Sequence, residues 1–317
     1  MGTTSRWWKR DEDGRVACGL CFRGCRITDG AAGACGDRLN HGGTLLSPWL
    51  GRFCARAVDP IEKKPLAHVL PGSTILSFGT AGCNLACKYC QNWEISTSRD
   101  IDTLTAPATP QALAAAASDA GAAGVAFTYN DPVIFAEYAI DTAAACREAG
   151  LASVAVSAGW ISPEPCTELF GAVDAANIDL KGFTDDFYRR VTGARLTDVL
   201  DTLTRVRALG TWLEITTLLI PGRNDSDAEI AAECAWIAAE LGAEVPVHFS
   251  AFHPAHRMRE TPRTPASTLE RARAIARDAG LAHVYLGNVR TRDGASTRCA
   301  GCGTLLVDRE GYRVTDY

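Results

Sequence analysis

Residues 79–96 read GTAGCNLACKYCQNWEIS and contain Cys83, Cys87 and Cys90 in a C-x3-C-x2-C pattern, with no fourth cysteine nearby. A [4Fe–4S] cluster takes one ligand per iron and is usually held by four thiolates, so three thiolates leave one iron open to a small molecule. A structural zinc site needs a fourth ligand and usually uses C-x2-C pairs. The apolar run Thr74–Phe78 indicates a strand before the loop. The pattern therefore predicts a cluster-binding loop at the end of a strand.

The composition is that of an ordinary globular chain. It has 317 residues, 47% hydrophobic and 22% charged, which suffice for one large domain with an appendage or for two domains. There is no apolar run of membrane-spanning length and no signal-peptide segment, so we expect a cytoplasmic protein without a membrane partner. The net charge of −5 indicates no overall basic surface for a polyanion, which argues against a nucleic-acid partner. Thirteen cysteines in such a chain indicate metal binding rather than disulfides, because the cytosol keeps thiols reduced.

Between residues 71 and 288, short apolar runs alternate with longer segments of helical pattern. The expected strands are Thr74–Phe78, Val125–Thr128, Ser153–Ser157, Val173–Asp179, Trp212–Leu219, Val245–Phe249 and His283–Leu286. The expected helices are Pro110–Ala120, Pro132–Ala149, Pro163–Phe170, Thr197–Leu209, Asp225–Leu241 and Pro265–Ala279. Strands and helices that alternate in this way form parallel sheets. Because six or seven such units are too few to close an eight-stranded barrel, we predict an α/β fold with an open, TIM-like (β/α)6 partial barrel.

The cysteines and glycines of the flanking regions set them apart from this centre. We divide the chain into a cysteine-rich, metal-binding N-terminal segment (1–70), the partial barrel (71–288) and a short C-terminal tail with a C-x2-C pair (289–317). In parallel barrels the chemistry lies at the carboxyl ends of the strands. We therefore looked for functional side chains just after each expected strand.

Cys18, Cys21, Cys25 and Cys35 form a self-contained quartet in a glycine-rich segment that is too small to fold on an apolar core. A bound metal would supply the missing free energy, since structural zinc contributes about 10–16 kcal/mol in small modules. Zinc is our first interpretation, an auxiliary iron–sulfur cluster the second, and free or redox-active thiols the third. Spacing does not separate zinc from iron–sulfur when every ligand is a thiolate.

The tail carries Cys299 and Cys302, which resemble half of a zinc ribbon. These two thiols would complete a site with Cys18 and Cys21 if the tail folded back onto the head of the chain. We prefer the N-terminal quartet, because it needs no long-range pairing.

Polar residues follow two of the expected strands. Asn130 and Asp131 end the second strand in the sequence TYNDP, where the alternative is a plain strand–helix cap. Asp179 and Lys181 end the fourth strand, and alternation places both on one side, where the alternative is an inward salt bridge. Charges in the mouth of a barrel are costly unless they are paired or used. These four residues are candidate functional residues.

Three weaker candidates would lie nearer a substrate. His248 and His253 end the sixth strand, and the end of a strand can direct both toward a cavity in which a histidine exchanges protons. Cys54 precedes the segment DPIEKKP and could approach the mouth of the barrel. We therefore treat these three as candidate catalytic residues.

The series of motifs resembles a known family over nearly the whole chain. The motifs are VDPIEKKPL (58–66), the cysteine loop (79–96), TYNDP (128–132), NIDLKGF (177–183), EITTLLIPGRNDS (214–226), VHFSAFHP (247–254) and YLGN (285–288). Together they resemble the radical SAM enzyme of the AmmeMemoRadiSam system, a group similar to pyruvate formate-lyase activating enzymes. The resemblance implies a [4Fe–4S] cluster on the cysteine loop, S-adenosylmethionine bound near Asn130, Asp131, Asp179 and Lys181, and an electron donor such as flavodoxin or ferredoxin.

The resemblance predicts an enzyme of oxidoreductase or lyase type. It would cleave S-adenosylmethionine reductively to a 5′-deoxyadenosyl radical, which takes hydrogen from a substrate that the sequence does not identify, a small molecule or a partner protein. One alternative is an activase that acts on a glycyl-radical enzyme. The other is a metal-binding scaffold that has lost radical chemistry, against which the intact cysteine triad argues.

Overall fold

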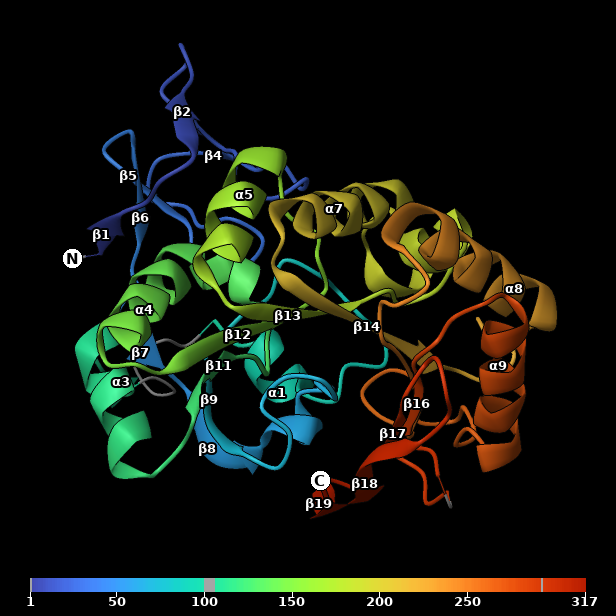
Figure 1. The fold of residues 1–317 in the computed structure, drawn as a ribbon. Helices are drawn as coiled ribbons and strands as arrows, with labels where there is room; N and C mark the ends of the chain where they lie inside the picture. The colour runs from blue at the N-terminus through green and yellow to red at the C-terminus, as the bar shows by residue number, and fades with distance from the viewer. Residues whose placement is uncertain (1, 100–105, 292) are drawn as a thin grey trace.

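The computed structural model describes residues 2–99, 106–291 and 293–317 (Figure 1). Its centre is an eight-stranded sheet with the order β16-β15-β14-β13-β12-β11-β9-β8. The strands are β8 (Ala55–Pro60), β9 (Thr74–Gly79), β11 (Gly124–Phe127), β12 (Ala152–Ser157), β13 (Ala175–Asp179), β14 (Trp212–Leu219), β15 (Val247–Ala251) and β16 (Val284–Gly287). All neighbours are parallel except β8, which runs antiparallel to β9. The α/β fold with a mostly parallel sheet is confirmed, and the (β/α)6 partial barrel stays a prediction.

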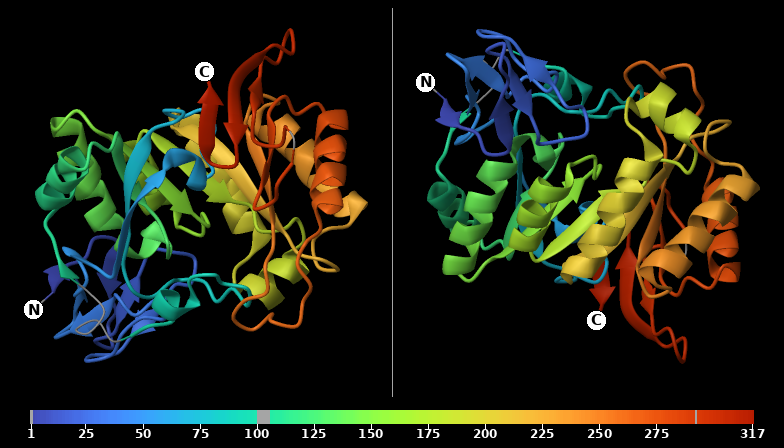
Figure 2. Two further views of the ribbon diagram at one scale, coloured as in Figure 1. Left: turned by 90° about the horizontal axis from the view of Figure 1, so that it is seen from below. Right: turned by 90° about the horizontal axis from the view of Figure 1, so that it is seen from above.

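Helices surround the outer face of this sheet (Figures 1 and 2). They are α3 (Pro110–Asp119), α4 (Ala136–Glu148), α5 (Pro163–Ala172), α7 (Leu196–Leu209), α8 (Asp227–Trp236) and α9 (Ala266–Asp278). The short helices α1 (Trp93–Ser96) and α6 (Asp185–Phe187) lie in the connections that follow β9 and β13. Proline stands in the first turn of α3 and of α5, where its missing N–H costs nothing. The predicted helix over 132–149 begins as a 3-10 turn at Pro132–Phe135, and that over 225–241 ends in a π turn at Ile237–Leu241. None of the described helices is both long and apolar enough to cross a bilayer.

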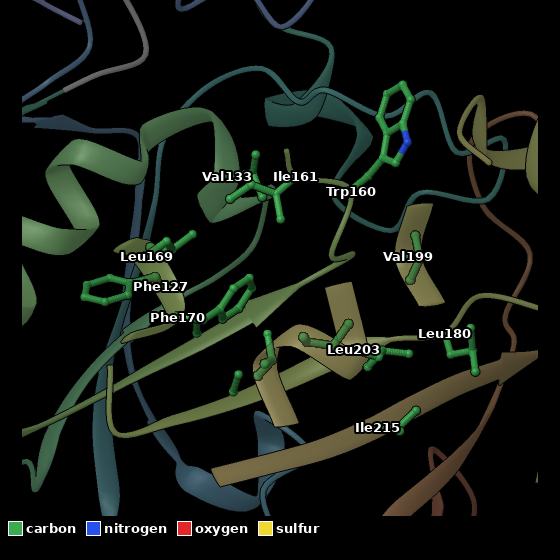
Figure 3. Close-up of a cluster of buried hydrophobic side chains, with 14 of the residues drawn as sticks. Phe127, Val133, Trp160, Ile161, Leu169, Phe170, Leu180, Val199, Leu203 and Ile215 are labelled. Carbon is green, nitrogen blue, oxygen red and sulfur yellow. The ribbon is translucent and has the colours of Figure 1, made fainter. Parts of the chain in front are cut away.

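The main core lies between the sheet and these helices. Figure 3 shows a cluster of fully buried side chains that includes Phe127, Leu169, Phe170, Leu180, Val199, Leu203 and Ile215. Leu169 and Phe170 come from α5, and Val199 and Leu203 from α7, where they repeat at helical spacing on one face. Burying each such side chain stabilises the fold by about 1.5–3 kcal/mol. This core fixes the strands whose carboxyl ends build the site.

Short strands form separate modules at the two ends of the chain. The N-terminal module contains β1 (Thr3–Thr4), β2 (Trp8–Arg10), β3 (Val16–Cys18), β4 (Arg26–Ile27), β5 (Leu39–His41) and β6 (Thr44–Ser47), and β7 (Arg52–Phe53) pairs with β10 (Ala106–Pro107). The C-terminal ribbon consists of β17 (Thr297–Arg298), β18 (Leu305–Glu310) and β19 (Arg313–Asp316). The module and the ribbon lie on opposite sides of the molecule (Figure 2). The alternative in which Cys299 and Cys302 join Cys18 and Cys21 is therefore wrong.

The C-terminal ribbon is fastened to the segment that connects β8 with β9. Arg309 of β18 is buried, and its guanidinium donates hydrogen bonds to the carbonyl of Ala67 (2.7 Å) and the hydroxyl of Thr297 (2.8 Å). It also forms an ion pair with Glu62, 3.3 Å away. Because a buried charge is costly unless it is paired, these contacts hold the ribbon against the open face of the sheet.

Candidate functional site

A cavity of about 370 Å³ lies where the carboxyl ends of the parallel strands meet. Its walls come from the cysteine loop, from the ends or inner faces of β11 to β16, from residues 62–67 and from the C-terminal ribbon. The carboxyl edge of a parallel sheet is the usual place for an active site. Cys83, Cys87, Cys90, Asn130, Asp131, Asp179, Lys181 and His248 all line it. The fold thus brings these residues together from four segments of the chain.

The three cysteines of the loop open onto this cavity. Burial raises the pKa of the Cys87 thiol to about 11 and that of Cys83 well above its usual value. The backbone N–H of Leu85 donates to the sulfur of Cys83 at 3.5 Å. Within the described ranges, no three Cys, His, Asp or Glu side chains are disposed as ligands around a single ion. A four-iron cluster places each thiolate on a different iron, so the three sulfurs need not meet at one point.

Asn130 holds the start of the cysteine loop with its side-chain amide. Its Oδ1 accepts the backbone N–H of Thr80 (3.1 Å), and its Nδ2 donates to the carbonyl of Gly82 (2.9 Å). Gly79, at the end of β9, permits this close approach, since a Cβ there would lie 2.4 Å from the carbonyl oxygen of Thr128. The amide of Asn130 is thus committed to the loop, although the residue lines the cavity.

The carboxylate of Asp131 is likewise occupied by hydrogen bonds to neighbouring residues. Its carboxylate accepts the N–H of Val133 (3.0 Å), the hydroxyl of Ser157 (2.9 Å) and the N–H of Ala158 (2.9 Å). Burial raises its pKa, although these hydrogen bonds favour the charged form. Asp131 therefore joins the ends of β11 and β12, which is the capping role that the sequence analysis gave as the alternative.

Asp179 and Lys181 form a close pair at the end of β13. Lys181 Nζ lies 2.7 Å from Asp179 Oδ2, and both side chains line the cavity. Burial alone would lower the pKa of Lys181, but the carboxylate of Asp179 outweighs it, and the pKa stands well above its usual value. An ammonium and a carboxylate therefore stand side by side in the wall of the cavity.

Two hydroxyl groups of residues in the cavity wall are buried without a hydrogen-bond partner in the described structure. They are the hydroxyl of Tyr89, between the second and third cysteines of the loop, and the hydroxyl of Thr216 on β14. A buried hydroxyl without a partner costs about 1–3 kcal/mol. Both residues line the cavity, so each unpartnered hydroxyl lies in its wall.

Another part of the cavity wall contains a hydrogen-bonded network around His248 and Glu214. His248 Nε2 lies 2.6 Å from the carboxylate of Glu214, which also accepts the backbone N–H groups of Ala67 and His68 at 2.8 and 2.9 Å. Burial alone would raise the pKa of Glu214, but these hydrogen bonds lower it. The ring of His248 stacks on that of Tyr285 at 5.0 Å. Glu214 thus stays ionised and fixes the imidazole.

The sequence analysis missed the partners of His248. The signal that could have found Glu214 is an acid inside the otherwise apolar strand WLEITTLL, because a buried charge needs a partner or a use. The structure does not bring His253 or Cys54 to the site, since neither lines the cavity. Cys54 donates its backbone N–H to the carbonyl of Gly79 at 2.9 Å, beside the end of β9.

The N-terminal cysteines line a second, much smaller cavity of about 10 Å³. It is formed by Cys18, Leu20, Cys21, Arg23, Gly24, Cys25, Gly33, Cys35, Arg38, Asn84 and Ile134. Burial raises the pKa of Cys21 to about 12 and that of Cys35 to about 11. The four thiols thus gather around one closed space, as their spacing predicted, although they are not arranged around a single ion.

Comparisons with known proteins agree with this arrangement. A family model described as the radical SAM superfamily matches residues 78–235. An uncharacterised protein of Methanocaldococcus jannaschii is 39% identical over 303 residues, which are 96% of this chain and 90% of that protein. The pyruvate formate-lyase-activating enzyme of Clostridium pasteurianum is 27% identical over 154 residues, 47% of this chain and 63% of that enzyme.

Solved structures share the fold. SuiB of Streptococcus suis, bound to S-adenosylmethionine, superimposes with a TM-score of 0.53 at 11% identity, over 68% of this chain and 52% of that chain. A radical SAM methyltransferase from Sphaerobacter thermophilus gives a TM-score of 0.51 at 17% identity, over 74% of this chain and 71% of that chain. At these identities the likeness is one of fold.

Proposed function

This chain belongs to the radical SAM superfamily, and we propose that it is an enzyme that cleaves S-adenosylmethionine to start radical chemistry on a substrate in the same cavity. Membership implies a [4Fe–4S] cluster and S-adenosylmethionine. When bound, these groups supply a 5′-deoxyadenosyl radical by reductive cleavage, and the radical takes hydrogen from the substrate. A flavodoxin or a ferredoxin is the electron donor that we propose.

One observation carries this proposal. Cys83, Cys87 and Cys90 face a cavity of about 370 Å³ whose wall also holds the unpartnered hydroxyls of Tyr89 and Thr216. Three thiolates would hold three irons and leave the fourth facing the cavity. The cavity beside the triad offers free space for a cofactor at that open position.

Asp179 and Lys181 would bind the amino-acid end of S-adenosylmethionine. That end carries a carboxylate and an ammonium group, which match the ammonium of Lys181 and the carboxylate of Asp179 in the cavity wall. Asn130 and Asp131 would act less directly, because their side chains are spent on positioning the cysteine loop and the end of β12. Their role is to set the place of the cofactor.

His248 is the residue that we propose for proton exchange with the substrate. Glu214 binds its Nε2, so the imidazole is held in one orientation and Nδ1 is left for a bound molecule. His253 and Cys54 do not line the cavity, and we assign them no catalytic part.

A second candidate function is activation of a glycyl-radical enzyme, with a glycine of that partner protein as the substrate. The 27% identity to a pyruvate formate-lyase-activating enzyme favours it. A protein radical detected by electron paramagnetic resonance after mixing with such a partner would support it. Turnover of a small molecule with deoxyadenosine formation and no partner would count against it.

We also propose that Cys18, Cys21, Cys25 and Cys35 bind a metal. The cavity that they line, of about 10 Å³, has room for one small species. A single zinc ion fits this space better than a four-iron cluster. The thiols would have to rotate about χ1 to meet at the ion, since they are not yet arranged as its ligands.

The test of the proposed function is anaerobic reconstitution of the protein with iron and sulfide. We expect about four irons per chain on the cysteine loop, visible iron–sulfur absorbance and reductive formation of 5′-deoxyadenosine and methionine. Absence of both the absorbance and the cleavage would leave a metal-binding scaffold as the better account.

A further inference from the structure

The N-terminal module contacts the cysteine loop on both sides of Cys83. On one side, Arg23 donates from Nε and Nη2 to the carbonyl of Asn84, at 3.1 and 2.9 Å. On the other side, Gly82 packs on the backbone of Cys35, where a Cβ would lie 2.0 Å from the carbonyl oxygen. Gly82 has φ +83°, so only glycine fits there without strain. The N-terminal module thus contacts Gly82 and Asn84, the residues directly before and after the proposed cluster ligand Cys83.

These contacts begin within the cysteine quartet itself. Arg23 lies between Cys21 and Cys25 in the sequence, and Cys35 supplies the carbonyl that meets the loop. Asn84 continues the contact into the barrel, because its Nδ2 donates to the carbonyl of Trp160 at 2.8 Å. The guanidinium of Arg23 also lies over the Trp160 ring, 5.2 Å from its centroid. Short, direct contacts therefore connect the quartet segment to the loop.

The surroundings of the quartet suit a metal bound by four thiolates. Such a centre with zinc carries a net charge of −2, and two basic residues, Arg23 and Arg38, are among those that line the same small cavity. Leu20 and Ile27 anchor the segment 18–35 in the main core, and a metal bound by its four thiols would constrain it further. With the metal bound, Arg23 and the carbonyl of Cys35 would be held at fixed positions.

We propose that the metal centre at Cys18, Cys21, Cys25 and Cys35 is a brace for the catalytic cluster: it fixes the loop around Cys83 and so makes the triad retain its iron. The proposal rests on the proposed function, since it needs a cluster on the triad. Arg23 is a positioning residue here, because it acts through the loop backbone and touches neither cofactor. The brace also explains why two cysteine groups far apart in the sequence meet at Asn84.

The test measures iron and zinc in the full chain after anaerobic reconstitution, together with the rate at which a chelator removes iron. The triad variant Cys83→Ala/Cys87→Ala/Cys90→Ala should keep about one zinc per chain. Arg23→Gln should keep the zinc but lose cluster iron about tenfold faster, since two hydrogen bonds from a charged group to the loop are gone. Cys25→Ser should lose zinc and show the same faster release of iron. Arg26→Gln is the matched control, because Arg26 pairs with Asp11 at the surface of the same module.

A triad variant that holds neither zinc nor iron would show that the quartet binds no metal and would overturn the proposal. So would unchanged iron release in both Arg23→Gln and Cys25→Ser. About four irons in the triad variant would identify the brace as a second iron–sulfur cluster and leave its role intact. If the wild-type triad takes up no iron while the zinc is present, the proposed function fails and the quartet site does not.

Discussion

The two cysteine groups of this protein meet at Asn84 but face very different spaces. The loop triad faces a cavity of about 370 Å³ with unpartnered hydroxyls in its wall, whereas the N-terminal quartet encloses about 10 Å³. The triad is one ligand short of a full set, and the quartet is complete. The difference teaches that the number of cysteines and the free volume before them together separate a reactive centre from a structural one.

The largest expected effect comes from substituting one cysteine ligand in the triad and one in the quartet, in separate variants. Cys87→Ser should abolish cluster iron and reduce cleavage of S-adenosylmethionine to the background of the reductant, because two thiolates do not hold the cluster. Cys25→Ser should instead lose zinc, while iron can still be loaded on the triad. Metal analysis of the two variants, with Cys146→Ser as a buried cysteine outside both groups, checks this. Loss of zinc together with iron in Cys87→Ser would mean that the two groups are one site.

The next largest effect is a loss of stability when the N-terminal module is detached from α4. Arg38 forms a buried, bidentate pair with Glu137 of α4, with both distances 2.7 Å. Arg38→Met leaves that carboxylate buried and unpaired, so we expect about 3–5 kcal/mol of lost stability. Thermal unfolding should show a clearly lower midpoint, and Arg38→Met/Glu137→Leu should recover part of the loss. An unchanged midpoint in the single variant would show that the pair adds little to the attachment of the N-terminal module to α4.

A smaller effect tests the wall of the large cavity. Lys181→Met removes the ammonium that we assign to the carboxylate of S-adenosylmethionine, so affinity should fall about 10–100-fold. Calorimetric titration of the reconstituted protein measures this, and circular dichroism checks that the fold is kept. Zinc content should not change. Unaltered affinity would remove Lys181 from the cofactor site.

The smallest effect comes from the unpartnered hydroxyl of the loop. Tyr89→Phe deletes only this group, and cofactor binding should weaken by no more than about tenfold, because one neutral hydrogen bond contributes about 0.5–1.5 kcal/mol. If the hydroxyl faces no ligand, the variant should instead be more stable than the wild type without cofactor and bind it equally well. Titration and thermal unfolding of the same samples distinguish the two outcomes.

Local signals account for what the sequence predicted. The seven parallel strands lie within two residues of their expected bounds, because apolar runs ending in glycine or proline mark strands and helices over short distances. The two cysteine groups were equally visible as spacing. The antiparallel edge strand β8 was not predicted, because charged residues interrupt its short apolar sequence ARAVDP. Its pairing with β9 is a tertiary contact that has no local sequence signal.

The contacts that decide the roles of side chains were not predictable in the same way. Asn130 and Asp131 line the cavity, but their hydrogen bonds to the cysteine loop and to β12 depend on how three strand ends meet. The link of His248 to Glu214 and Tyr285 depends on the register of β14, β15 and β16. A single sequence contains no local pattern for such a register.

The most direct test of the comparison is the electron paramagnetic resonance spectrum of the reduced, reconstituted protein before and after S-adenosylmethionine is added. An open iron on the triad predicts one reduced [4Fe–4S] signal that changes when the cofactor binds, in wild type and in Cys25→Ser alike. A signal that S-adenosylmethionine leaves unchanged, or one that survives in Cys87→Ser, would contradict the assignment of the triad as the open, reactive centre.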